Sequence, residues 1–149
     1  MDKVSTIDDM NALAEELNRL QAKLLTDFYS VVQDFPSRKL FPNWLQQKSV
    51  SNVLVVDKGK PVLDKILASK RLSVVLYDLE TPDLNGLQFL QALRGIPEAR
   101  TRTKVLLMSQ RLAPEAKDKL VQLGMDALVC KPVTPESLQE AFNKIGLKY

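Results

Sequence analysis

The chain has 149 residues, of which 45% are hydrophobic and 26% charged, and a net charge of +3 at pH 7; this size suits one globular domain with an appendage. It contains no histidine, which excludes histidine-based acid–base catalysis, the usual zinc sites and a phosphohistidine on this chain. The single cysteine, Cys130, excludes an internal disulfide framework and is expected in the core.

Residues 1–35 are predicted to form an N-terminal amphipathic helix. Apolar residues recur every three or four positions over residues 7–35, as on one face of a helix, and Pro36 ends the pattern. Met10, Leu17 and Leu24 also recur every seven residues, as in a coiled coil, but Gln21 interrupts the companion column. The helix is therefore expected either to pack against its own domain or to pair with a second chain.

The rest of the chain changes character after a short connector. Residues 36–52 are predicted to be a connector with buried anchors, because they contain the apolar residues Leu40, Phe41, Trp44 and Leu45. Residues 53–149 alternate short apolar runs with helical stretches. The predicted strands are 53–57, 73–78, 104–109 and 127–130, and the predicted helices are 61–69, 87–94, 114–123 and 135–145. This alternation predicts an α/β fold, a doubly wound parallel sheet with helices on its faces.

The predicted strands end on chemically useful side chains. These are Asp57 with Lys58, Asp78, Ser109 and Lys131. Since the carboxyl ends of parallel strands meet at one edge of a sheet, we expect these side chains to converge. Two carboxylates, a hydroxyl and an ammonium group at one edge favour phosphoryl or anion chemistry centred on Asp78.

Two segments resemble the receiver domain of two-component response regulators, over about residues 50–149. The stretch DLETPDLNG that begins at Asp78 resembles the family's phosphoacceptor loop, and LGMDALVCKPV, which contains Lys131, resembles its final strand. The resemblance implies a flavodoxin-like fold in which a histidine kinase phosphorylates Asp78 and Lys131 pairs with the phosphoryl group. It also implies a cis bond before Pro132, as is common in the family.

The resemblance further implies Mg²⁺, held by an acidic pair after the first strand, by the phosphoacceptor and by a backbone carbonyl two residues beyond it. In this sequence these positions are assigned to Asp57 with Lys58, to Asp78 and to Glu80. An ammonium group in the acidic pair would repel a divalent cation and pair with Asp78 instead. We therefore expect weak Mg²⁺ binding and an impaired phosphorylation site, as in a pseudo-receiver. Alternatively, Lys58 is an exposed loop residue and Glu80 supplies a replacement ligand.

Two further positions depart from the family pattern. Ser109 keeps the hydroxyl that contacts the phosphoryl group, but Gln110 follows it where the family favours a small side chain. Leu128 lies three residues before Lys131, where many members carry an aromatic switch residue.

The predicted function is a receiver-like signal-transduction module that acts by protein–protein interaction and is no enzyme beyond self-phosphorylation and autodephosphorylation. The alternative is an active phosphoacceptor in a phosphorelay.

The spacing between the first two predicted strand ends indicates a truncated sheet. Only 20 residues separate Asp57 from Asp78, too few for the helix, strand and second helix that the family places there. We therefore predict four strands, with the family's first helix and second strand missing. The exposed edge would be covered by the N-terminal helix of the same chain or of a partner in a homodimer.

A third hypothesis comes from the enzyme class. The residues DLET at Asp78 also resemble the D-x-D-x-T nucleophile motif of haloacid-dehalogenase-type phosphatases, with Glu80 in place of the second aspartate.

No helix-turn-helix follows the receiver-like part, so no nucleic-acid partner is expected, and the expected partner is a histidine kinase or another signalling protein. No apolar run approaches the ~18 residues of a membrane span and the N-terminus is no signal peptide, so a cytoplasmic location without membrane contact is expected.

Overall fold

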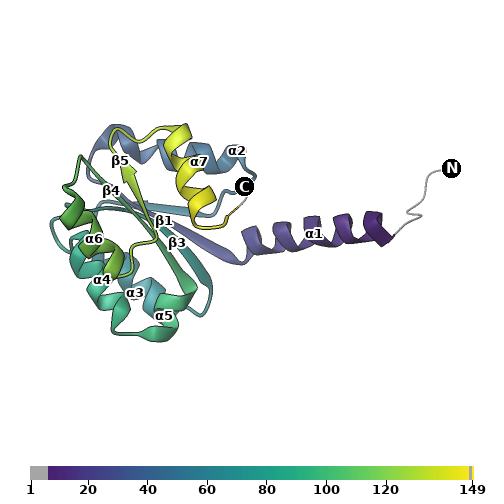
Figure 1. Ribbon diagram of the computed structural model, residues 1–149, viewed down its shortest axis with the longest axis horizontal. Helices are drawn as coiled ribbons and strands as arrows, with labels where there is room; N and C mark the ends of the chain where they lie inside the picture. The colour runs from purple at the N-terminus through teal and green to yellow at the C-terminus, as the bar shows by residue number, and fades with distance from the viewer. Residues whose placement is uncertain (1–6, 148) are drawn as a thin grey trace.

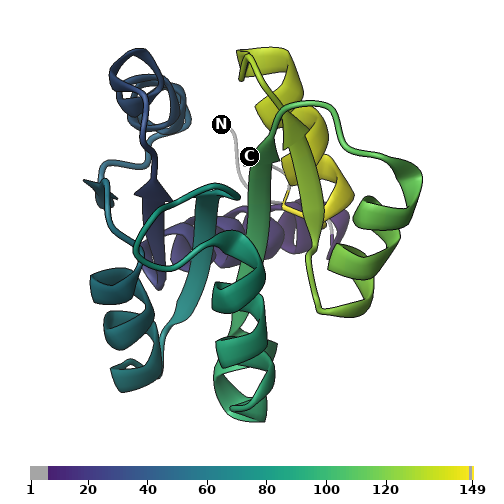
Figure 2. The same ribbon diagram turned by 90° about the vertical axis from the view of Figure 1, so that its left-hand side faces the viewer.

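Five parallel strands form one sheet in the computed structural model, which describes residues 7–147 and 149 (Figures 1 and 2). The strands are β1 (Thr26–Val31), β2 (Val53–Val56), β3 (Leu72–Asp78), β4 (Thr103–Ser109) and β5 (Ala127–Cys130). Their order across the sheet is β2-β1-β3-β4-β5, so β2 and β5 are the edges. The predicted doubly wound α/β class is confirmed.

Helices cover both faces of this sheet. In chain order, the helices of the described residues are α1 (Ile7–Leu24), the 3-10 helix η1 (Phe35–Arg38), α2 (Leu40–Gln47), α3 (Lys60–Ala68), α4 (Gly86–Arg94), α5 (Pro97–Arg102), α6 (Pro114–Gln122) and α7 (Pro135–Lys144), and all but α1 lie against the sheet. Side chains of α2 and α7 pack on one face, and those of α3, α4, α5 and α6 pack on the other. Figure 1 shows these two groups of helices on the two sides of the sheet. The result is a three-layer arrangement with two hydrophobic clusters, one on each side of the sheet.

The central strands β3 and β4 are apolar through most of their length because both of their faces are covered. In β3, Val74 and Leu76 belong to the cluster beneath α2 and α7, whereas Val75 and Tyr77 belong to the cluster on the other face. This burial on both sides fixes the register of β3 in the middle of the sheet. As a consequence, the strand delivers its last residue, Asp78, to the carboxyl edge.

The predicted helix over residues 7–35 is wrong beyond Leu24. The helix α1 ends at Leu24, and β1 begins at Thr26. Residues 25–32 are rich in aromatic and β-branched residues, which favour a strand. Phe28 and Val31, which continue the helical spacing, contact opposite faces of the sheet and so share no helical stripe. Residues 1–6 of the predicted segment lie outside the described residues.

The prediction of a four-stranded sheet without the first helix and second strand is also wrong. The first strand is β1, and η1 with α2 forms the helical segment that follows it, within the predicted connector. The anchors Phe41, Trp44 and Leu45 are buried in α2. The strand ending before Asp57 is β2, the second in the chain, and the interval to Asp78 holds α3 and β3. The sheet is therefore complete.

The predictions for residues 53–145 agree closely with the structure. Each predicted strand and helix in this range is present, with both of its ends within one residue of the predicted position. The short helix α5 was not predicted, because its six residues include only one buried side chain, Ala99, and so carry no apolar period. The boundaries of the helices are well marked in this part of the sequence, since Pro114 and Pro135 begin helices.

Helix α1 extends away from the sheet (Figure 1). None of its residues is buried. Packing of this helix against its own domain, one of the two predicted arrangements, is therefore not seen in the part of the chain that the structure describes. No helix among the described residues is long and apolar enough to cross a membrane.

Candidate functional site

Asp78 lies at the carboxyl end of β3 and is almost fully buried, with 2% of its side chain exposed. Its Oδ2 atom accepts a hydrogen bond from the ammonium group of Lys131 at 2.8 Å, and its Oδ1 atom accepts one from the backbone amide of Glu80 at 3.1 Å. Both carboxylate oxygens are thus held by donors. A buried carboxylate without such partners would be strongly unfavourable.

The loop after Asp78 is fixed by side-chain hydrogen bonds. The hydroxyl of Thr81 donates to the carbonyl of Asp78 at 2.7 Å, and Thr81 itself is buried. Further along, the Asn85 side chain caps helix α4 by accepting from the backbone amide of Gln88. The carboxylate of Asp83 accepts from the backbone amides of Gly59 and Lys60, each at 3.0 Å. These contacts hold the loop against α3 and α4.

Ser109 and Lys131 join Asp78 from the two strands that follow it across the sheet. Ser109 is buried at the end of β4, and its carbonyl accepts a hydrogen bond from the backbone amide of Lys131 at 2.9 Å. The Lys131–Pro132 peptide bond is cis. The structure therefore places the predicted Asp78, Ser109 and Lys131 at adjacent strand ends, β3, β4 and β5.

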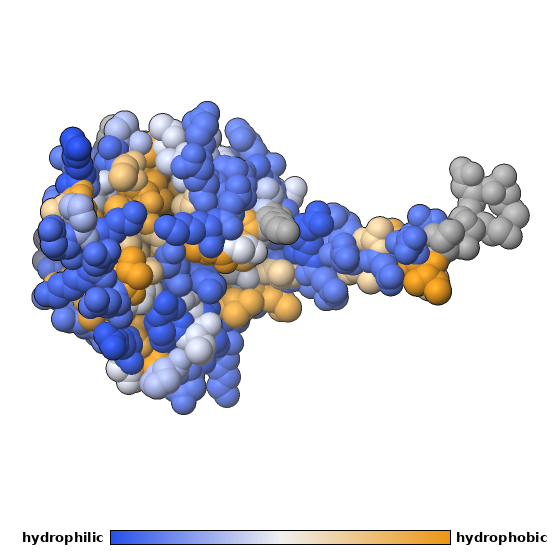
Figure 3. All heavy atoms as spheres, in the orientation of Figure 1, coloured by the Kyte–Doolittle hydropathy of each residue, from blue (hydrophilic) through white to orange (hydrophobic). Residues whose placement is uncertain are grey.

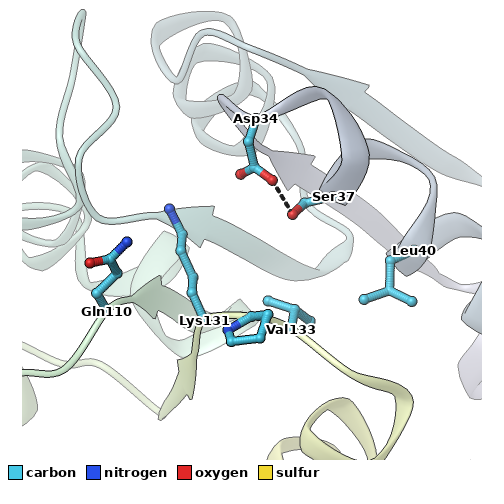
Figure 4. A pocket seen from close by; sticks show the side chains of 7 residues that line it. Asp34, Ser37, Leu40, Gln110, Lys131 and Val133 are labelled. Carbon is cyan, nitrogen blue, oxygen red and sulfur yellow. Dashed lines mark hydrogen bonds between the residues drawn. The ribbon is translucent and has the colours of Figure 1, made fainter.

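A cleft of about 650 Å³ lies beside this group (Figure 4). It is lined by Asp34, Ser37, Leu40, Gln110, Lys131, Pro132 and Val133. In Figure 4 the Lys131 side chain extends between Gln110 on one side and Asp34 with Ser37 on the other. The cleft thus gives solvent access to Lys131, whose ammonium group donates to Asp78.

Asp34 is the acidic residue that the sequence predictions missed. It follows β1, and its carboxylate accepts a hydrogen bond from the Ser37 hydroxyl. That bond, aided by the positive charge of Lys131, lowers the pKa of Asp34 below its ordinary value. The signal was present in the sequence as the apolar run before Gln33 and Asp34, but this run had been assigned to a helix.

The structure does not bring Asp57 and Lys58 to Asp78 as predicted. They follow the edge strand β2, and β1 lies between β2 and β3. Asp57 is more than half exposed and lies 3.6 Å from the guanidinium of Arg38. Lys58 lines a different surface hollow, together with Gln33, Asp57, Pro82 and Asp83. The acidic pair after the first strand therefore corresponds to Gln33 and Asp34.

Oxygen donors suited to Mg²⁺ are available at the corrected position. Among the described residues there is no group of three or more His, Cys, Asp or Glu side chains that could hold a metal ion. The carboxylates of Asp34 and Asp78 and the backbone carbonyl of Glu80 are hard oxygen donors, and Mg²⁺ usually binds one or two carboxylates and keeps several waters. This donor set fits Mg²⁺ better than it fits a transition metal.

The other positions singled out in the sequence differ in how exposed they are. Gln110 is exposed and lines the cleft, while Leu128 is partly buried against the cluster on the α3–α6 face. Cys130 is exposed at the end of the edge strand β5, so its predicted place in the core is wrong. It is the last residue of this edge strand and lines a surface hollow together with Ser137 and Ala141 of α7.

Comparison with known proteins identifies relatives along most of the chain. Residues 30–143 match the family model described as the response regulator receiver domain. The chain is 30% identical over 137 residues to the sensory/regulatory protein RpfC of Xanthomonas campestris pv. campestris, a match that covers 91% of this chain and 19% of that protein. It is 24% identical over 104 residues to the two-component response regulator ORR3 of Oryza sativa subsp. indica, covering 70% of this chain and 79% of that protein.

The fold is similar to solved structures of the same kind. The chemotaxis response regulator CheY4 of Vibrio cholerae matches with a TM-score of 0.70 at 21% identity, covering 81% of this chain and 98% of that one. The chain spans about a fifth of the length of RpfC, the first of these relatives. The family match begins within β1 and ends within α7, so it contains every strand end described above. The chain therefore belongs to the response regulator receiver domain family of two-component signalling.

Proposed function

We propose that this receiver domain accepts a phosphoryl group on Asp78 and passes the signal on by contact with a protein partner. The observation that carries the proposal is the pairing of Asp78 with Lys131 at 2.8 Å, beside a cleft that Asp34 lines. The phosphoryl donor we propose is a histidine kinase, since this chain has no histidine of its own.

The contacts of Asp78 suit it to act as the nucleophile. Phosphoryl transfer forms a bond between a carboxylate oxygen and phosphorus and breaks the bond between phosphorus and the donor's leaving group. Both partners are anionic, so the reaction needs fixed positive charge close to the carboxylate. Lys131 supplies such a charge from within the chain, and the backbone amide of Glu80 orients the other carboxylate oxygen. After transfer, Lys131 can pair with the oxygens of the phosphoryl group.

Asp34, Asp78 and the carbonyl of Glu80 are the groups that would hold Mg²⁺. Bound there, Mg²⁺ would offset the negative charge of the phosphoryl oxygens. Gln33 lies where the acidic pair has its other acid, and its amide donates to the carbonyl of Asp57 at 2.5 Å. Only one carboxylate of the pair is therefore present, and a bound Mg²⁺ would keep water as its other ligands.

The case for an impaired site depended mainly on Lys58, with Gln110 and Leu128 as further departures from the family pattern. Lys58 follows β2, so its ammonium group is not part of the acidic pair. Without it, the active phosphoacceptor becomes the better supported of the two predicted receiver functions. The phosphatase-like hypothesis has no supporting observation, because the segment around Asp78 falls within the receiver match.

The proposal is tested by incubating the protein with Mg²⁺ and a small phosphodonor, and then measuring its intact mass. We expect a labile, phosphate-sized mass increase in the wild type and none in Asp78→Asn. Asp118→Asn, which changes an exposed aspartate of α6 away from the site, is the matched control, and it should still be phosphorylated. No increase in the wild type, or an increase that persists in Asp78→Asn, would contradict the proposal and favour the pseudo-receiver.

A further inference from the structure

The apolar stripe of α1 is not covered by any of residues 7–147 and 149, which the structure describes. Its large hydrophobic side chains are between 44% and 76% exposed, namely Ile7, Met10, Leu13, Leu17, Leu20 and Leu24. Figure 3 shows apolar surface both near the far end of this helix and at its root. An isolated helix of this length is marginal in water, so its stability calls for packing along the stripe.

We propose that α1 is a dimerisation helix, which pairs antiparallel with α1 of a second copy of this chain. The proposal concerns a surface remote from Asp78 and does not depend on phosphorylation. Four features of the helix support it: its apolar spacing, its length, the order of its charges and a hollow at its root.

The spacing of the stripe is that of a coiled-coil seam. Met10, Leu17 and Leu24 form one column, and Leu13 and Leu20 form the other, so that the intervals alternate strictly between three and four residues. This is the pattern of the two core positions of a heptad repeat. Because α1 ends at Leu24, the polar Gln21 no longer interrupts a core column but flanks it.

The length of the helix selects a register. If two copies run antiparallel within one residue of full overlap, Leu13 lies opposite the partner's Leu17, and Met10 lies opposite the partner's Leu20. Each residue of one core column then faces a residue of the other column, as core layers of antiparallel pairs require. The contact is isologous, so it closes as a dimer and leaves no free apolar stripe to recruit a third copy.

The order of charges favours the antiparallel direction. Along α1 the four acidic residues Asp8, Asp9, Glu15 and Glu16 all precede the two basic residues Arg19 and Lys23. In the antiparallel register Asp9, which flanks the seam, faces the partner's Lys23. A parallel pair would instead place the acidic residues of the two helices side by side. Glu16 lies near the two-fold axis, where its own ion pair with Arg19 at 3.0 Å offsets its charge.

A hollow at the C-terminal end of α1, the end next to the sheet, lies where the N-terminal end of the partner helix would pack. It has a volume of about 230 Å³ and is lined by Leu20, Lys23, Leu24, Ser49, Ser51 and Asn52. In the proposed register the partner's Met10 and the partner's Ile7 reach this level of the helix. Lys23 donates to the carbonyl of Lys48 at 3.0 Å, and its ammonium group has further donor hydrogens for the partner's Asp9.

A lipid surface is the other candidate for an apolar stripe, and the charges disfavour it. Helices that bind membranes through their interface carry lysine and arginine on the polar face. The polar face of α1 carries four acidic and two basic residues. Anionic lipids would repel it, whereas a second copy complements it.

The first test is the mass of the full chain in solution, measured by sedimentation equilibrium on unphosphorylated protein. We expect twice the mass of one chain at micromolar concentrations. Leu17→Glu should raise the dissociation constant of the dimer at least roughly 100-fold, since it places two charges in the seam. Asn18→Glu, on the outer face, is the matched control and should dimerise like the wild type. Since α1 buries none of its residues, the domain should fold in both variants.

The second test concerns direction. Asp9→Lys should weaken the dimer roughly tenfold, because it opposes the partner's Lys23, whereas Asp8→Lys makes the same charge change on the outer face and should have little effect. In a Cys130→Ser background, Ala14→Cys should form a disulfide between residue 14 of one chain and residue 14 of the other, since both lie near the two-fold axis of the dimer. Met10→Cys should not, since the two sites would lie about 15 Å apart.

Each outcome decides the inference. A wild-type mass of one chain throughout the concentration range overturns the dimer. A dimer that Leu17→Glu leaves intact overturns the role of α1. A dimer in which Met10→Cys links and Ala14→Cys does not overturns the antiparallel direction.

Discussion

At the scale of single residues, the pairing of Asp78 with Lys131 explains how a carboxylate is kept in a nearly dry position. Asp78 is buried among strand ends, and burial of an unpaired charge would cost several kcal/mol. Lys131 is 23% exposed, so it can remain charged in water while its ammonium group reaches Asp78. The same contact leaves the Lys131 side chain open to an anionic group that arrives through the cleft.

Gly59 is a second residue on which the site depends. A Cβ atom at this position would lie 1.7 Å from the hydroxyl oxygen of Tyr77, which itself donates to the carbonyl of Leu84 in the loop after Asp78. Tyr77 is fully buried, so it cannot move aside freely. We expect Gly59→Ala to lower the free energy of unfolding by roughly 1–3 kcal/mol, measured by urea denaturation.

Gly95 is the matched control for that substitution. A Cβ atom there would come no closer than 3.5 Å to any neighbour, and its backbone is already helical. Gly95→Ala should therefore change the free energy of unfolding by less than about 0.5 kcal/mol, or raise it. Equal losses for the two variants would show that contact with Tyr77 is not the cause.

At the scale of secondary-structure elements, β1 shows what sequence patterns could and could not predict. Phe28 and Val31 are spaced as on a helix, yet they serve two different faces of a central strand. Apolar spacing alone does not separate these cases for a short run. The composition does, because residues 7–24 are rich in Ala and Leu while residues 25–32 are rich in aromatic and β-branched residues.

That single element decided which site residues were found. Asp78, Ser109 and Lys131 were predicted at strand ends because their strands have clear turn and helix signals on both sides. Asp34 was missed because its strand was read as a helix, and Asp57 took its place. The error was therefore one of strand order rather than of chemistry.

The start of α3 is tied to the loop after β3 by Asp83. Burial acts to raise the pKa of Asp83, but the hydrogen bonds from the amides of Gly59 and Lys60 outweigh it and lower the pKa below 3.8. A lowered pKa in the folded state stabilises the fold above pH 3.8, and this contribution is lost as the pH falls through the folded value. The stabilisation acts at a helix N-terminus, where such bonds contribute roughly 1 kcal/mol.

Asp83→Ala should thus lower the free energy of unfolding by roughly 1 kcal/mol at pH 7. The difference from the wild type should shrink as the pH is lowered below about 4, because the wild-type carboxylate is then protonated. Denaturation curves at several pH values measure it. Asp118→Ala, an exposed substitution in α6, is the control; a difference for Asp83→Ala that stays constant down to the lowest pH would contradict the assignment.

At the scale of the whole molecule, the parallel topology assembles the site from distant parts of the chain. The ends of β1, β3, β4 and β5 supply Asp34, Asp78, Ser109 and Lys131 to one edge of the sheet. The edge strand β2 and its Asp57 lie outside this group. Helix α1 begins before the receiver match and lies outside the three layers, which makes it available for a separate role.

The central claim is that the acid paired with Asp78 is Asp34 and not Asp57, and it is tested by the Mg²⁺ dependence of phosphorylation in Asp34→Asn and Asp57→Asn. Both are exposed aspartates with a partner in η1, so the two variants are closely matched. We expect Asp34→Asn to slow phosphorylation of Asp78 by roughly tenfold or more, and Asp57→Asn to leave it nearly unchanged. Loss of phosphorylation in Asp57→Asn, with Asp34→Asn unaffected, would contradict this account of the site.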